Sequence, residues 1–528
     1  MNDSSIHSSL SQQSETPVQV FHTKIAISPI IQTVFEILLP DTMFNISQAA
    51  VFMIIAHYLN CYINDFVGLT DILTPAIAIN LVTILISDSV VEAGIHYISK
   101  SLITKKLNES QTYFIYTIIF GALSSVIVSF VILVGVQKQL TSFILWRLQN
   151  IQKKKVYQIL VTMFIFAHFA SLLQKFMKVE GQSNLALNYF GLILQLYSVT
   201  TTIFFAQIKK QVITSLNFVP CIATPLIVSA IYSLFKVFHL FPKQIKYNNI
   251  LFVGKSTFKS MHPKIIAKIS KLSLYNIYQN VGDALIKLFT AQLLTYSDIP
   301  VVIFTLLQLE LTNALNKSIS NNMASAFRIN IQLRRYDRVF QFFVSSFVIS
   351  IVNFAYQILT FSFRNIIYKL IYNQFDSTLH LFHGSVDGLL GIFSAFSTAV
   401  MRSNPNTYMG LFTGSFKLVL AVGFWLTAKY TNSGNSHYSA MLYRYKYCTD
   451  IVGLGLFVLY FQKFYTLKKR NSTQEEMKES KLIPQELQVI ETVSIQQSES
   501  KETLQESKTN EILVSQSQTH EESKIKEE

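Results

Sequence analysis

Long apolar runs separated by short polar or basic connections organise most of the chain. Runs of about 20 or more mostly apolar residues recur twelve times between residues 30 and 466. This is the length that an α-helix needs to cross about 30 Å of hydrocarbon. The pattern predicts an all-α polytopic membrane protein with about twelve transmembrane helices. The predicted spans are 31–59, 68–97, 112–136, 156–175, 184–207, 212–240, 266–294, 299–325, 339–362, 379–401, 407–429 and 448–465.

Polar segments flank this apolar body and divide it in two. Residues 1–29 are rich in Ser and Gln and predict a disordered cytosolic tail. Residues 467–528 form a second tail, acidic and without aromatic residues, which cannot bury enough apolar surface to fold alone. The Lys-bearing connection 242–265 separates an N-lobe of six helices, 30–241, from a C-lobe of six helices, 266–466.

Composition and charge support a membrane protein. Only 14% of the residues are charged, whereas soluble domains carry about a quarter. From Arg470 onward the chain has 7 Lys and Arg against 13 Asp and Glu, so the net charge of +14 divides into −6 for this tail and +20 for the rest. These features exclude a soluble enzyme and a disulfide-stapled secreted protein. They also disfavour nucleic-acid binding, because membrane-length apolar runs interrupt the basic residues.

The basic residues predict the orientation of the chain in the membrane. Short loops after the second and eighth helices are basic, whereas those after the first and seventh contain no Lys or Arg. The basic residues in question are Lys100, Lys105, Lys106, Arg328, Arg334, Arg335 and Arg338. The positive-inside rule then places both termini in the cytoplasm, with these side chains near lipid headgroups. The basic loop after the third helix departs from the rule.

The two halves show signs of an internal repeat. Residues 44–48 match 275–279, residues 104–108 match 333–337, and Met177-Lys178 matches Met401-Arg402. The offsets are 231, 229 and 224 residues, in order along the chain. Because each half has an even number of predicted helices, both halves have the same orientation, as in parallel-repeat transporters.

Residues 30–465 resemble the multidrug and toxic compound extrusion (MATE) family of the multidrug/oligosaccharidyl-lipid/polysaccharide flippase superfamily. The resemblance is carried by Leu39-Pro40 with Gln48 eight residues after the proline, by residues 320–342, and by the Met401-Arg402 step. It implies two six-helix bundles that form a V-shaped cleft. It also implies export of amphipathic, often cationic compounds in exchange for H⁺ or Na⁺.

Two other functions remain open at this stage. One is a lipid or lipid-linked oligosaccharide flippase of the same superfamily, which predicts a basic cleft facing the headgroup. The other is a non-transporting membrane scaffold that signals through its acidic tail. The sequence does not indicate the oligomeric state.

Ionisable groups inside the membrane are the main candidates for function, because each costs about 2.5–3.5 kcal/mol on insertion scales. In the seventh predicted helix, Asn276, Gln279, Asp283 and Lys287 are spaced three or four apart and share one face. There a carboxylate can accept a proton or a cation and the amides can bind a substrate. The alternative is an Asp283–Lys287 ion pair within the helix that only stabilises packing.

The first predicted helix carries a matching stripe of Asp41, Asn45 and Gln48, followed by His57. The MATE family often has an acidic residue about seven positions after this glutamine, where the present chain has Ile55. His57 can titrate near neutral pH. A single histidine in a helix can equally be a hydrogen-bonded packing residue.

The remaining charged candidates lie in other predicted helices. Asp387 precedes Arg402 by fifteen residues, whereas the family usually has a carboxylate about eleven residues before this arginine. Glu310 is a weaker candidate, as are Asp88 and Glu92, which are expected to reach water near a helix end. We expect Asp283 and Asp387 to face an aqueous passage between the halves.

The chain has no catalytic motif, and its three cysteines, Cys61, Cys221 and Cys448, are far apart. Residues 249–256 end like a phosphate-binding loop, but Asn249 replaces the first glycine. We therefore expect no enzyme activity, no cofactor and no metal site. The expected partners are a small organic cation, the coupling ion and membrane lipid.

Overall fold

A computed structural model describes most of the predicted spans. The described residues are 38–61, 89–104, 107–131, 185–209, 227, 228, 231, 232, 235, 263–293, 309–363, 366, 369, 381–405, 407–430, 441–471 and 473. The tail 1–29, the predicted helix 156–175 and nearly all of the connection 242–265 lie outside them. Among these residues the structure contains helices and no strand, as predicted.

The chain divides into two compact units, Met1–Gln462 and Lys463–Glu528. Residues 463–471 of the second unit are helical, although the sequence predicted a disordered tail from 467. All that follows concerns the first unit. Its helices are α3 (Leu39–Cys61), α5 (Ser89–Ile103), α6 (Leu107–Phe130), α9 (Leu185–Lys209), α12 (Pro263–Leu293), α14 (Ala314–Gln332), α15 (Tyr336–Ser362), α17 (Leu381–Ser403) and α18 (Thr407–Tyr430).

The helical residues 441–462 complete this unit and are called the terminal helix below. Most helix ends agree with the predicted spans to within a few residues. The largest differences are at the start of the terminal helix, predicted at 448, and at the end of α14, predicted at 325. The sequence predicted Arg328 in a loop beside lipid headgroups. This prediction is wrong, because Arg328 lies inside α14 and is only 5% exposed.

Helices satisfy their own backbone hydrogen bonds, which hydrocarbon requires. Several Ser and Thr side chains on these helices also form hydrogen bonds within their own helix. The hydroxyls of Thr42, Thr117, Ser273 and Thr290 donate to the carbonyl four residues earlier, over 2.6–2.7 Å. Such local bonds allow Ser and Thr to lie within apolar helices without another partner.

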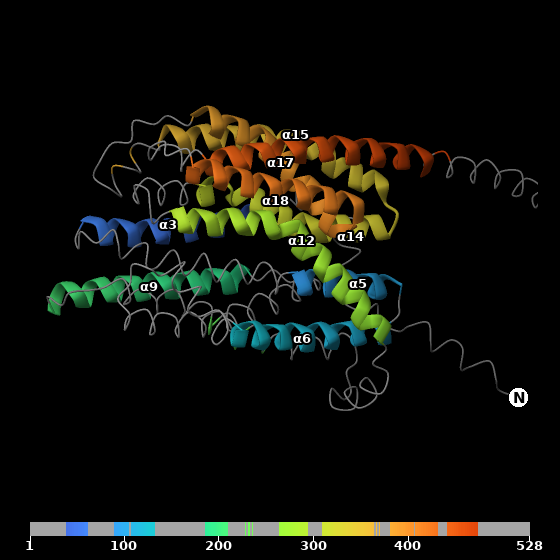
Figure 1. The fold of residues 1–528 in the computed structure, drawn as a ribbon, viewed down its shortest axis with the longest axis horizontal. Coiled ribbons are helices and arrows are strands. Elements are labelled where there is room, and N and C mark those ends of the chain that lie inside the picture. The colour runs from blue at the N-terminus through green and yellow to red at the C-terminus, as the bar shows by residue number, and fades with distance from the viewer. Residues whose placement is uncertain are drawn as a thin grey trace, which may run out of the picture. The chain divides into compact units, whose positions relative to one another are not determined.

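The long helix α12 packs against both predicted lobes. Its first part lies on α5 and α6, where Ile269 joins a core with Ile98 and Tyr113. Its second part lies along α18, where Ile286 joins a core with Ala421 and Tyr445 of the terminal helix. Figure 1 shows α12 running from α5 and α6 to α18. Further contacts between the predicted lobes join α3 and α5 to α14.

A cluster of phenylalanines forms the core of the C-lobe helices. Phe327 of α14 packs against Phe342 and Phe343 of α15 and Phe396 of α17, with ring centroids 5.5–6.0 Å apart. All four side chains are at most 2% exposed. Aromatic pairs at these distances stabilise packing beyond their buried area. The cluster therefore holds α14, α15 and α17 as one body.

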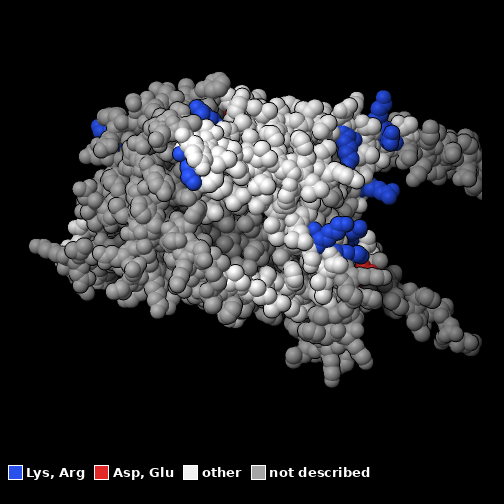
Figure 2. All heavy atoms as spheres, viewed as in Figure 1, with Lys and Arg blue, Asp and Glu red and all other residues white. Residues whose placement is uncertain are grey.

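The outer faces of several helices are apolar and exposed. On α15, Val348 and Ile351 are 65% and 67% exposed, and on α9 Ile193 is 60% exposed. Contiguous exposed apolar surface of this kind indicates contact with lipid or another apolar partner. Among the described helices, Tyr189–Ile208, Tyr336–Ser362 and Tyr408–Tyr430 are long and apolar enough to cross a membrane. On the face in Figure 2, Lys and Arg gather at the ends of the described surface and leave an uncharged band between them.

Gly282 permits the close approach of α12 and α18. A methyl group added there would lie 2.5 Å from Lys417 Cβ and 2.6 Å from its backbone carbonyl carbon. We expect Gly282→Ala to force the two helices apart and to destabilise the protein by about 1–3 kcal/mol. Thermal unfolding of the detergent-solubilised protein measures the change.

Gly423→Ala on α18 is the matched control, because a methyl group there has no neighbour within 4 Å. It should leave stability unchanged or raise it by about 0.5–1 kcal/mol through helix propensity. Equal melting temperatures for the two variants would contradict the close contact.

Candidate functional site

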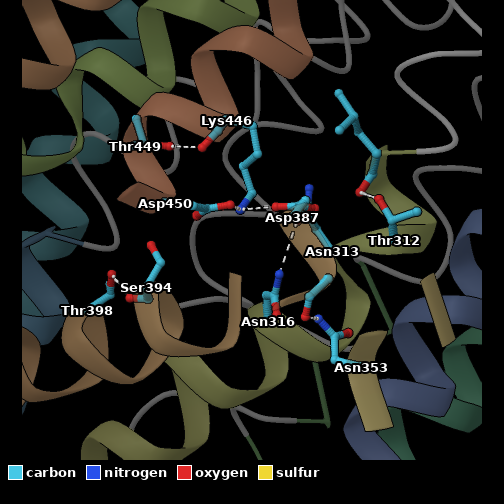
Figure 3. Close-up of polar contacts among 12 residues, drawn as sticks. Thr312, Asn313, Asn316, Asn353, Asp387, Ser394, Thr398, Lys446, Thr449 and Asp450 are labelled. Atoms are coloured by element: carbon cyan, nitrogen blue, oxygen red, sulfur yellow. Dashed lines mark hydrogen bonds and ion pairs between the residues drawn. The ribbon is translucent and has the colours of Figure 1, made fainter. Parts of the chain in front are cut away.

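Two buried carboxylates share one ammonium group inside the C-lobe. Lys446 of the terminal helix lies with its Nζ 2.9 Å from Oδ1 of Asp387 on α17 and 2.5 Å from Oδ2 of Asp450. Figure 3 shows Lys446 reaching between the two carboxylates. Asp387 is 6% exposed and Asp450 is 1% exposed. The expectation that Asp387 faces an aqueous passage is therefore not met in this conformation.

Amide side chains and glycines surround this carboxylate pair. Asn316 donates to Asn313 Oδ1 over 3.5 Å, and Asn353 of α15 donates to the Gly388 carbonyl, next to Asp387, over 2.9 Å. A methyl group at Gly391 would lie 2.4 Å from the Asn316 amide nitrogen. The glycine therefore lets Asn316 approach α17 at the turn that follows Asp387 (Figure 3).

The composition of this cluster determines what it can bind. With both carboxylates ionised, Asp387, Lys446 and Asp450 carry a net charge of −1 in a buried position. A like-charged pair of carboxylates favours uptake of a proton by one of them, and the two titrate as a unit. Carboxylate and amide oxygens are also hard ligands of the kind that bind Na⁺. The cluster can therefore exchange one monovalent cation.

Asp283 lies in a separate, charge-balanced group. Its Oδ2 is 2.5 Å from Lys417 Nζ on α18, and its Oδ1 accepts a hydrogen bond of 2.8 Å from the Tyr445 hydroxyl. The alternative of an intrahelical Asp283–Lys287 pair is not found, because the partners of Asp283 lie on other helices. This group joins α12, α18 and the terminal helix.

Glu310 is the centre of a third group. Its two carboxylate oxygens lie 3.7 Å from Lys287 of α12 and 3.7 Å from Lys317 of α14. The three side chains are 38–51% exposed. Lys287, predicted on the face of Asp283, thus pairs with Glu310 instead.

Polar contacts join the predicted lobes. Asn45 of α3 donates to Ser318 over 3.1 Å, and Asn322 donates to Asp41 over 2.8 Å. On α12, Asn276 donates to the Ser89 carbonyl of α5 over 3.3 Å. Two candidate residues from the sequence, Asn45 and Asn276, are therefore interface residues here.

An ion pair adds to this interface. Glu92 of α5 lies 3.7 Å from Arg402 of α17, and Arg402 also donates to Asn321 Oδ1 over 2.8 Å. Arg328 donates to the Arg402 carbonyl over 3.3 Å. Glu92, which we expected to reach water near a helix end, lies in the first turn of α5, is 16% exposed and pairs with Arg402 across the predicted lobes. Beside Arg402, Gln279 donates to Met401 Sδ over 3.3 Å.

The remaining predicted residues, Gln48 and His57, lie half-buried on α3. The structure thus distributes the candidates over three charged groups and the lobe interface. Sequence reasoning missed Asp450 and Lys446, although Lys-x-x-x-Asp within an apolar run was a usable signal. The predicted helix start at 448 placed Asp450 at an edge, whereas it lies well inside the terminal helix.

Comparison with known proteins shows similarity in structure alone. No protein-family profile matches the chain. No curated protein matches it in sequence. Among solved structures, the outward-facing conformation of a multidrug resistance MATE family transporter matches over 86% of this chain and 97% of its own, with a TM-score of 0.57 and 13% identity.

The chain has the MATE fold. The inward-facing conformation of a multidrug resistance MATE transporter also matches, over 86% of this chain and 99% of its own, with a TM-score of 0.51 and 13% identity. A crystal structure of MATE in complex with MaD3S covers 86% of this chain and 98% of its own, with a TM-score of 0.57 and 12% identity. The all-helical polytopic fold predicted from the sequence is confirmed.

Removing the shared ammonium of the Asp387 cluster should be more harmful than removing one carboxylate. Lys446→Gln leaves two buried carboxylates without their counter-charge, and we expect a loss of about 3–5 kcal/mol of stability. Asp450→Asn leaves one carboxylate and one ammonium, and should cost clearly less. Thermal unfolding in detergent compares the variants.

The triple variant D387N/K446Q/D450N tests the same point without charges. It should recover most of the stability lost in Lys446→Gln, because no buried charge then lacks a partner. If Lys446→Gln and Asp450→Asn unfold at the same temperature, the three residues do not form a common group.

Proposed function

We propose that this protein is a secondary-active membrane transporter that works by alternating access and is driven by H⁺ or Na⁺. The observation that carries the proposal is the Asp387–Lys446–Asp450 cluster. With both carboxylates ionised, it places one uncompensated negative charge inside a MATE fold. An intramembrane charge of this kind is costly and marks an ion pathway by default.

The contacts between the lobes support alternating access. Among the described residues, the polar contacts between the predicted lobes are a few hydrogen bonds and an ion pair, such as Asn45–Ser318 and Glu92–Arg402, beside the apolar packing of α12 on α5 and α6. A net hydrogen bond contributes only about 0.5–1.5 kcal/mol, so contacts of this kind can break and re-form. Similarity to solved structures in both outward-facing and inward-facing conformations is consistent with this motion.

Cation binding at the Asp387 cluster can drive the change of state if its affinity differs between the two conformations. Here the cluster is enclosed between α17 and the terminal helix. An altered packing of these helices would change the distances from Lys446 to the two carboxylates. The affinity of the pair for H⁺ or Na⁺ would change with them.

The proposal includes the topology and the kind of substrate that the sequence predicts. Both termini are cytoplasmic, and the substrate is a small organic compound that the protein exports. The complex of a MATE structure with MaD3S supports binding of a ligand other than the coupling ion. The cationic substrate implied by the resemblance remains a prediction. The charges of the Glu310 group are relevant to it.

Cross-linking the lobes should stop transport. The Asn45 and Ser318 side chains lie 3.1 Å apart on α3 and α14. In a background with Cys61, Cys221 and Cys448 changed to Ser, oxidised N45C/S318C should lose transport by at least tenfold and recover it on reduction. Uptake by proteoliposomes before and after dithiothreitol measures both.

The single variants N45C and S318C are the controls, because neither can close the disulfide. Full activity of the oxidised, fully cross-linked double variant would show that these helices do not separate. That result would contradict alternating access at this interface.

Removing either carboxylate of the cluster should uncouple transport. In Asp387→Asn or Asp450→Asn, the remaining carboxylate is neutralised by Lys446, so the site no longer attracts a further cation. We expect gradient-driven transport in proteoliposomes to fall at least tenfold for each variant. Imposed H⁺ and Na⁺ gradients, applied separately to a panel of fluorescent organic ions, identify the coupling ion.

Asp337→Asn is the matched control, because Asp337 lies in the first turn of α15, outside the cluster. It should retain wild-type transport. Asp283→Asn tests the charge-balanced Asp283–Lys417 group and should affect coupling less than either change in the cluster. Unchanged transport in D387N/D450N would remove the cluster from the mechanism.

A further inference from the structure

The Glu310 group differs in composition and geometry from the other two charged groups of the C-lobe. It contains two ammonium groups, Lys287 and Lys317, and one carboxylate, so its net charge is +1. Its ion pairs are long, at 3.7 Å each, whereas the Asp283 and Asp387 carboxylates lie 2.5 Å and 2.9 Å from their ammonium partners. Long pairs between half-exposed groups are weak. A ligand can therefore compete with Glu310 for either lysine.

The Glu310 group lies on the two C-lobe helices that meet the N-lobe. On α12, Asn276 contacts α5, and Lys287 follows eleven residues later, about three turns and roughly 16 Å along the same face. Ser318 of α14 contacts α3. Lys317 and Glu310 precede Ser318 in the chain, on the side away from the Arg334 loop. The group therefore lies beyond the described contacts between the lobes, toward the C-terminal end of α12 and the N-terminal end of α14.

The side chains of this group are partly exposed. Lys287 is 38% exposed, Glu310 is 50% exposed and Lys317 is 51% exposed. Charged side chains within spanning helices face water or protein rather than lipid, because contact with hydrocarbon is costly. A half-exposed charged group between the lobe-facing helices is thus placed to meet a solute that enters between the lobes.

We propose that Lys287 and Lys317 form the binding site for an anionic group of the transported substrate. A carboxylate, sulfonate or phosphate on the substrate replaces Glu310 between the two ammonium groups, and Glu310 neutralises one lysine when the site is empty. This proposal rests on the transport function above and names the substrate class of that function. The same chemistry suits a soluble organic anion and an anionic lipid headgroup.

The neighbouring charges agree with an anion. The half-exposed carboxylate of Asp283 is already neutralised by Lys417. The carboxylates of Asp387 and Asp450 are enclosed. Within the Glu310 group, the two lysines therefore exceed the carboxylate charge by one. An organic cation would be repelled here.

Fluorescence anisotropy tests binding directly on the full-length protein in detergent. The probes are carboxyfluorescein and pyranine as organic anions and ethidium as an organic cation. Lys287→Gln and Lys317→Gln should each weaken anion binding at least tenfold. Glu310→Gln should strengthen it several-fold, because the internal competitor is lost. Lys271→Gln is the matched control on the same helix, exposed and sixteen residues before Lys287, and should bind as the wild type.

Transport assays separate the two anion sources. Carboxyfluorescein in phosphatidylcholine vesicles tests soluble anions, and fluorescent phosphatidic acid, followed by dithionite quenching, tests lipid flipping. Sensitivity of one activity to Lys287→Gln and Lys317→Gln identifies the source.

Several outcomes would overturn the anion site. One is the absence of anion binding in both the wild type and Glu310→Gln. Another is anion binding that both lysine changes leave intact. A third is ethidium binding that Glu310→Gln abolishes and the lysine changes do not. A failure of the transport function is distinguishable: no probe would then cross the membrane under any gradient, while lysine-dependent anion binding persists.

Discussion

The cost of an ionised side chain in hydrocarbon is the constraint on which the C-lobe depends. Each membrane-depth carboxylate of the groups described above has an ammonium group within 4 Å, and the partners lie largely on different helices. Asp283–Lys417 joins α12 to α18, Asp387–Lys446 joins α17 to the terminal helix, and Glu310 joins α12 to α14. The charges thereby specify which helices are neighbours, while the phenylalanine core supplies the apolar contact area.

The positions of the helices could be predicted from the sequence, whereas the partners of the charged residues could not. Apolar runs of membrane length are a local signal, and α15, α17 and α18 lie close to their predicted spans. Pairing between helices depends on packing that the pattern of residues along one chain does not reveal. The helical spacing of Asp283 therefore offered Lys287 as a partner but did not indicate Lys417. Errors in helix ends placed Arg328 in a loop and left Asp450 unnoticed near the predicted helix start at 448.

Two charged groups of opposite excess occur in one lobe. When both of its carboxylates are ionised, the Asp387 group carries one surplus negative charge in the protein interior, whereas the Glu310 group carries one surplus positive charge among half-exposed side chains. Together with the balanced Asp283 group they then sum to zero. On the proposals above, a cation bound at the first group and an anion bound at the second preserve this neutrality.

The packing of α12 against both lobes has a mechanical consequence. This helix begins against α5 and α6 of one predicted lobe and ends along α18 of the other. Any rotation of one lobe must therefore tilt, bend or shift α12. The lobes consequently cannot move as independent bodies. Gly282 of α12 and Gly410 and Gly414 of α18 are positions at which these two helices lie in close contact. A tilt of α12 at its α5 end would therefore also shift Asp283 and Lys287, which follow Gly282 on the same helix.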